Sequence, residues 1–172
     1  QITVLSNGTT TTVATFVRIP SGAAPMLAYT QYDPLVGVPP GEVAIQLRSP
    51  HGGVHEGLPA SLPRRQNPHM HLFEAMIAAF DATHDLVFQN RAGNFFSLFL
   101  ANLYDKQRQV LGEYFEEDFS KIEPVSVEPG HQAEWVWLLK GFERITGCPT
   151  GRYRGELLAS ALRYRDEATG CL

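Results

Sequence analysis

The chain has 172 residues, of which 44% are hydrophobic, and a formal net charge of −4. That length and composition suffice for one hydrophobic core, whereas the acidic balance argues against a nucleic-acid partner. We also expect no membrane partner, because the sequence has neither an apolar run of membrane-spanning length nor a signal peptide. Two cysteines, Cys148 and Cys171, give no disulfide framework and no zinc-ligand spacing, so the expected location is the cytoplasm.

Residues 1–42 predict an atypical N-terminal segment. Threonines run from Thr9 to Thr12, and proline–glycine clusters occupy residues 20–25 and 39–41. Such residues favour irregular or β-prone structure, and the segment has no 3.6-residue periodicity. We expect it to be disordered, translated out of frame, or a divergent N-terminal cap. Residues 43–172 form the second expected domain.

The first predicted helix spans about residues 68–83. Asn67 is expected to be its N-cap, because asparagine is favoured there and Pro68 suits the first helical position. At helical spacing, Asn67, His71 and Glu74 share one side, above a stripe of small residues. Polar groups at a helix start above small residues predict the wall of a cavity.

Three further helices are predicted, at about residues 94–107, 131–146 and 152–166. Asn94 is the expected cap of the first of them. At the next helix start, Pro129 precedes His131 in the first turn, and Glu134 follows at i+3. Four helices within residues 43–172 predict an all-α domain.

His131 and Glu134 suit acid–base chemistry at the start of a helix. The positive end of the helix dipole favours a neutral imidazole, which is able to accept a proton. Glu134 could orient His131, bind a hydroxyl group, or take part in proton transfer. The structural alternative is a histidine that is simply hydrogen-bonded to its own i+3 carboxylate.

Two strings, Arg-Gln-Asn-Pro-His-Met-His-Leu-Phe-Glu-Ala at 65–75 and Glu-Pro-Gly-His-Gln-Ala-Glu-Trp-Val-Trp-Leu-Leu at 128–139, resemble the N-acylglucosamine 2-epimerase family. The resemblance extends over residues 43–172. It implies an (α/α)6 barrel of twelve helices, which cannot fit into this length, so the expected fold is an incomplete barrel. It also implies that a second catalytic histidine lies beyond Leu172, and that a substrate-binding arginine has no match in residues 1–42.

The resemblance implies a role for each matching residue. His131 corresponds to one of two histidines that move the proton at sugar C2, and Glu134 to its acidic partner. Asn67 and His71 correspond to residues that contact substrate hydroxyls. The implied substrate is a monosaccharide or a sugar phosphate, and no metal or other cofactor is required.

The implied reaction passes through an enediolate. Returning the proton to the opposite face of C2 gives epimerisation, whereas returning it to C1 gives aldose–ketose isomerisation. Both strings look most similar to the mannose-type isomerases, so that outcome is the expectation. The sequence leaves open the particular sugar and the oligomeric state.

Two alternatives remain open from the sequence. His69, His71 and Glu74 resemble the start of a cupin-type metal set, although such ligands project from strands and these residues favour a helix. The other alternative is a catalytically incomplete fragment that binds sugar without turning it over. Low stability or aggregation of the isolated chain would accompany it, because helix faces would lack partners.

Overall fold

The computed structural model describes residues 2–6, 9–16, 27–28, 49–57, 60–165 and 168–170. The chain divides into two compact units, Gln1–Ser61 and Leu62–Leu172. Cys171 and much of the predicted N-terminal segment lie outside the described residues. Within the described part, no helix is long and apolar enough to cross a membrane.

The first unit contains a small antiparallel sheet. Strand β1 (Ile2–Ser6) pairs with β2 (Thr9–Phe16), and β2 pairs with β3 (Leu27–Ala28). The run of threonines lies in β2, where β-branched side chains suit the pleated backbone. The prediction of β-prone sequence in this region is confirmed for these strands.

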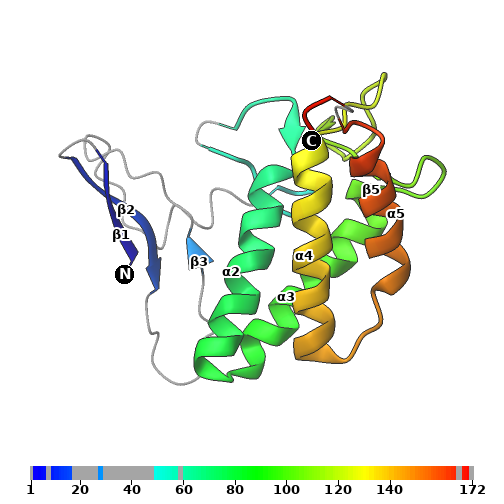
Figure 1. The fold of residues 1–172 in the computed structure, drawn as a ribbon. Coiled ribbons are helices and arrows are strands. Elements are labelled where there is room, and N and C mark those ends of the chain that lie inside the picture. Colours follow the sequence, from blue (N-terminus) through cyan, green and yellow to red (C-terminus); the bar gives the residue numbers. More distant parts are fainter. Residues whose placement is uncertain are drawn as a thin grey trace. The chain divides into compact units, whose positions relative to one another are not determined.

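The second unit is mainly helical. Its α-helices are α2 (Asn67–Thr83), α3 (Leu86–Leu98), α4 (Pro129–Thr146) and α5 (Gly151–Leu162), and the π-helix η1 (Phe99–Leu103) extends α3. Helices α2 and α4 lie side by side with their N-termini at the same end, while α3 packs against α2 and α5 against α4 (Figure 1). The prediction of an all-α domain is confirmed.

Short strands in the long connection between η1 and α4 pair with one another or with a strand that precedes α2. Strand β4 (Arg64–Arg65) pairs with β7 (Tyr114–Phe115), and β5 (Tyr104–Asp105) pairs with β6 (Val110–Leu111). Because β4 directly precedes α2, the first pair ties this connection to the N-terminal end of α2. That same end of the unit carries the start of α4.

An aromatic cluster forms the core between the helices. The Trp135 ring stacks on Phe99 at a centroid distance of 4.7 Å and on Phe73 at 5.3 Å. All three side chains are buried, and they come from α4, η1 and α2. Trp135 is therefore a packing residue. Trp137 differs, because 62% of it is exposed.

The start of α2 differs from the prediction by one residue. The N-cap is Gln66, and Asn67 is the first helical residue, with Pro68 following it. The Gln66 side chain does not cap the helix but points into the unit, where it meets Trp135 and Glu113. The sequence rule favoured asparagine as a cap because it considers only local hydrogen bonds.

The predicted helix at 94–107 is wrong at both ends. The helix begins at Leu86, and the Asp85 side chain caps it by accepting a hydrogen bond from the Val87 N–H at 2.9 Å. At the other end, residues 104–107 form strand β5 and the start of a turn. This turn is stabilised by Asp105, whose carboxylate accepts backbone N–H groups of Gln107 and Arg108. The last helix likewise ends at Leu162 rather than at 166.

These boundaries predict opposite effects for two substitutions in α3. Asp85→Ala is expected to lower the free energy of unfolding by about 1 kcal/mol, because it removes the cap. Asn94→Ala is expected to raise it by about half a kcal/mol, since alanine has the higher helix propensity at an exposed interior position. Urea denaturation of the two variants measures both effects. A larger loss for Asn94→Ala would instead place the helix start at residue 94.

Candidate functional site

The predicted site residues lie at one end of the helical unit. Asn67 and His71 occupy the first two turns of α2, and His131 and Glu134 occupy the first two turns of α4. Since α2 and α4 are neighbours with their N-termini at the same end, both pairs lie at that end (Figure 1). The structure thus brings together elements that are about 60 residues apart in the sequence.

His71, Glu74 and Glu134 form a cluster between the two helices. One ligand atom from each side chain lies within 4.8 Å of the others, and His71 Nδ1 is 3.5 Å from Glu74 Oε2. His71 is exposed, whereas Asn67, Glu74 and Glu134 are half-buried. This face can therefore receive a polar ligand, with two carboxylates and one imidazole as hydrogen-bonding groups.

His131 has a different partner from the one that its own helix suggests. His131 Nδ1 lies 3.0 Å from Oε2 of Glu113, a buried residue in the connection between β6 and β7. Glu134, the i+3 residue, instead belongs to the cluster with His71 and Glu74. The simple interpretation of a histidine paired with its own i+3 carboxylate is thus not what the structure shows.

Glu113 belongs to a buried hydrogen-bond network. The Trp135 Nε1–H donates to Gln66 Oε1 at 2.8 Å, and Gln66 Nε2 donates to Glu113 Oε2 at 3.3 Å. Gln66 and Trp135 are both fully buried. The network joins the starts of α2 and α4 to the connection that precedes α4, and it ends at His131.

Burial raises the pKa of Glu113 above that of an ordinary glutamate. Desolvation is the largest cause, and the nearby negative charge of Glu128 adds to it. The hydrogen bonds from His131 and Gln66, together with the charge of His131, act in the opposite direction but do not cancel the effect. The carboxylate is therefore held in an environment that disfavours its charge.

Glu113→Gln is expected to raise the free energy of unfolding at about pH 7.5 and to leave it nearly unchanged at about pH 4. A carboxyl group with a raised pKa in the folded state contributes most at low pH, and this contribution is lost as the pH rises through that pKa. A neutral glutamine avoids the loss. Urea unfolding at both pH values measures the difference, with the exposed Glu116→Gln as a control that should change neither value.

A larger rise in the free energy of unfolding at the lower pH than at the higher pH would contradict the expected pH dependence of Glu113→Gln. His131 and Glu128 are the titratable groups that influence Glu113.

His69 does not join the cluster. It is fully buried, its Nδ1 lies 3.2 Å from the Arg65 carbonyl oxygen, and its ring packs against Phe119 at 5.7 Å. His69 and His71 face apart, as their two-residue spacing on a helix predicts. The cupin-type set of His69, His71 and Glu74 is therefore wrong, since these residues lie on a helix and not on a strand.

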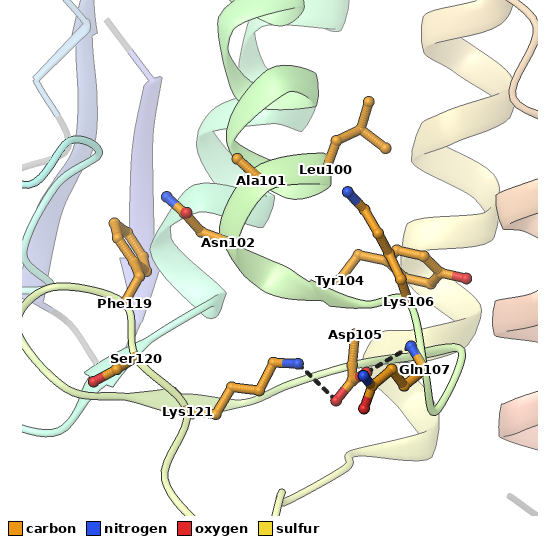
Figure 2. A pocket seen from close by; sticks show the side chains of 10 residues that line it. All are labelled: Leu100, Ala101, Asn102, Tyr104, Asp105, Lys106, Gln107, Phe119, Ser120 and Lys121. Carbon is orange, nitrogen blue, oxygen red and sulfur yellow. Dashed lines mark hydrogen bonds and ion pairs between the residues drawn. The ribbon is translucent and has the colours of Figure 1, made fainter.

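A separate pocket lies beside η1 and the turn between β5 and β6. Its cavity has a volume of about 520 Å³ and contains none of the four predicted site residues. Figure 2 shows Lys121 and Asp105 joined across it, with Lys121 Nζ 2.8 Å from Asp105 Oδ2. Asp105 also binds Arg108 at 2.9 Å. Burial alone would raise the pKa of Asp105, but hydrogen bonds from Lys121, from the side chain and backbone of Arg108 and from the Gln107 N–H hold it well below the usual range. We regard Asp105 as a structural residue of this turn, because its interactions stay within the loop region.

Together these features define a mainly helical unit in which histidine and carboxylate side chains gather at the N-terminal ends of two neighbouring helices. The model of the N-acylglucosamine 2-epimerase (GlcNAc 2-epimerase) family matches residues 43–172, and the chain belongs to that family.

Two curated relatives are named as mannose isomerases. Mannose-6-phosphate isomerase of Rhizobium meliloti (strain 1021) is 33% identical over 103 residues, covering 57% of this chain and 27% of that protein. D-mannose isomerase of Thermobifida fusca is 34% identical over 98 residues, covering 50% of this chain and 24% of that protein. The chain thus spans about a quarter of the length of these relatives.

The solved structure of cellobiose 2-epimerase from Spirochaeta thermophila DSM 6192 shares the fold. Its TM-score is 0.61 at 23% sequence identity, and the match covers 77% of this chain and 39% of that chain. The expected fold class is confirmed, and the helices described above form part of an (α/α)6 barrel.

Proposed function

We propose that this chain carries part of the active site of a carbohydrate isomerase or epimerase that moves the C2 proton of an open-chain sugar. The observation that carries the proposal is the meeting of α2 and α4, which places His71, Glu74 and Glu134 within reach of one ligand beside the turn of His131. Membership of the N-acylglucosamine 2-epimerase family supports it.

His131 is the proposed acid–base group. A hydrogen next to a carbonyl carbon becomes removable once an enediolate can form, and a histidine has the ordinary pKa, about 6.5, for both directions of such a transfer. Its place in the first turn of α4, on the same side as the cluster one turn further on, suits contact with a sugar bound there. The chemistry needs no metal or redox cofactor.

Asn67 and His71 are the proposed hydroxyl-binding groups. We add Glu134, which the sequence suggested as the acidic partner of His131, because it clusters with His71 while His131 bonds to Glu113. Sugar hydroxyls both donate and accept hydrogen bonds, and an amide, an imidazole and a carboxylate together offer both functions. The substrate is a monosaccharide or a sugar phosphate. We favour a mannose-type aldose–ketose isomerisation, because both curated relatives are named for mannose or mannose 6-phosphate. A cytoplasmic location is part of the proposal and depends only on the two cysteines of the sequence.

A second candidate function is sugar binding without turnover. The open character of the face favours it, since 47% of the His71 side chain is exposed in this chain. Enclosure of a sugar strengthens its polar contacts and excludes water, so an open face binds weakly.

Hydrogen exchange at C2 separates the two candidates. The purified protein is incubated with D-mannose in D2O, and the loss of the H2 proton signal is followed by NMR. The proposal predicts protein-dependent exchange together with the appearance of D-fructose, both unaffected by EDTA. Sugar-dependent shifts in the protein spectrum without any exchange would support binding alone, and a rate that EDTA abolishes would contradict a metal-free mechanism.

A further inference from the structure

Glu113 has no role in the function proposed above, yet it makes the closest polar contact of His131. We propose that Glu113 is a positioning residue: its carboxylate accepts the Nδ1–H of His131 and leaves Nε2 as the atom that exchanges a proton with the sugar. The contact is 3.0 Å between Nδ1 and Glu113 Oε2. This inference rests on the proposed function, because it assigns the atom through which His131 acts.

The hydrogen-bond donors in the Trp135–Gln66–Glu113–His131 network determine which nitrogen of His131 carries the hydrogen. An indole N–H only donates, so Trp135 requires the oxygen of Gln66 to face it, and the Gln66 amide nitrogen then faces Glu113. An ionised carboxylate only accepts, so the imidazole nitrogen beside it carries the hydrogen. Both donors converge on the same oxygen, Oε2.

The backbone around Glu113 is fixed independently of its side chain. The Glu113 N–H donates to the Ser126 carbonyl at 3.2 Å, and the Gln66 N–H donates to the Glu113 carbonyl at 3.1 Å. The preceding Gly112 donates to the Leu103 carbonyl, and a Cβ at Gly112 would lie 3.0 Å from the Phe115 ring. The loop therefore holds the carboxylate in place and does not depend on it for attachment.

The buried Glu113 carboxylate also lowers the stability of the folded protein. Glu113 is 4% exposed, and among the described residues its second oxygen, Oε1, has no hydrogen-bond partner. An incompletely satisfied buried carboxylate lowers stability, and buried groups that titrate abnormally gather at functional sites. Since backbone hydrogen bonds already attach the loop, what the side chain adds is a buried acceptor that serves both His131 and Gln66.

Two substitutions separate the role of Glu113 as a hydrogen-bond acceptor from the role of its negative charge. Glu113→Gln keeps an oxygen that can accept from both His131 and Gln66, whereas Glu113→Met keeps the length and apolar bulk but removes the acceptor. The exposed Glu116→Gln is the matched control in the same connection. The tautomer of His131 in the purified protein is read from long-range ¹H–¹⁵N correlations at about pH 8.5, where imidazoles are neutral.

The proposal predicts the Nδ1–H tautomer in the wild type, in Glu113→Gln and in the control, and its loss in Glu113→Met. It also predicts that the kcat for C2 exchange falls by about 10²-fold or more in Glu113→Met, with KM little changed, because an imidazole in the wrong tautomer cannot accept the proton. An Nε2–H tautomer in the wild type, or an unchanged tautomer in Glu113→Met, would overturn it.

These results are distinguishable from a failure of the proposed function. If His131→Asn retains C2 exchange, His131 is not the acid–base group and the function itself is wrong. If His131→Asn loses exchange while Glu113→Met keeps both the tautomer and kcat, the inference alone is wrong. If the methionine variant does not fold, the tautomer of the wild-type protein still decides the matter, because an Nε2–H tautomer there overturns the inference.

Discussion

His131→Asn is expected to reduce the rate of C2 hydrogen exchange by about 10²–10⁴-fold, the range that a general acid or base contributes. Asparagine cannot accept and return a proton near neutral pH, but its amide N–H can occupy the place of Nδ1 and donate to Glu113. The substitution therefore removes the proton-transfer atom and retains the buried hydrogen bond. Single-turnover exchange of D-mannose in D2O measures the loss.

A histidine remote from the site provides the control. His84 ends α2 at the opposite end from Asn67 and has a φ of +55°, a left-handed conformation that asparagine tolerates. His84→Asn is thus expected to leave the exchange rate unchanged. Equal losses in His84→Asn and His131→Asn would indicate general destabilisation instead of a catalytic role.

Glu134→Gln is expected to weaken sugar binding by about ten- to a hundredfold. A hydrogen bond to a charged group contributes about 1.5–3 kcal/mol, and every 1.4 kcal/mol corresponds to tenfold in affinity. Glu134 clusters with His71 and Glu74, whereas His131 bonds to Glu113. We therefore expect the weaker binding to appear as a higher KM, with little change in kcat. Steady-state kinetics of mannose conversion measure both constants.

The matched control for this charge change is Glu116→Gln, an exposed carboxylate in the connection before α4. It is expected to change neither constant. A fall in kcat for Glu134→Gln with KM unchanged would mean that Glu134 takes part in proton transfer, and it would contradict the binding role.

The helical spacing of the sequence predicted the local geometry of the site. Asn67, His71 and Glu74 occur at the start of one helix and His131 and Glu134 at the start of another, because i+3 and i+4 neighbours share a helix side. The two helices meet because of tertiary packing around Trp135, and the periodicity of the sequence alone does not predict such packing. The family resemblance supplied that expectation instead.

The contacts of Glu113 and Gln66 could not be predicted from sequence patterns. Neither has a partner at helical spacing: Gln66 reaches Trp135 across 69 residues, and Glu113 reaches His131 across 18. Gln66 also occupies the N-cap position that a local rule gave to Asn67. An indication was nevertheless available for α3, since Asp85 precedes Leu86 and Val87, and aspartate is a favoured cap.

The most direct test of the site as a whole is a titration of the ¹⁵N-labelled protein with D-mannose. We expect chemical-shift changes at the first turns of α2 and α4, centred on Asn67, His71, His131 and Glu134. Changes centred on the separate pocket around Asp105 and Lys121, with the two helix starts unaffected, would contradict it.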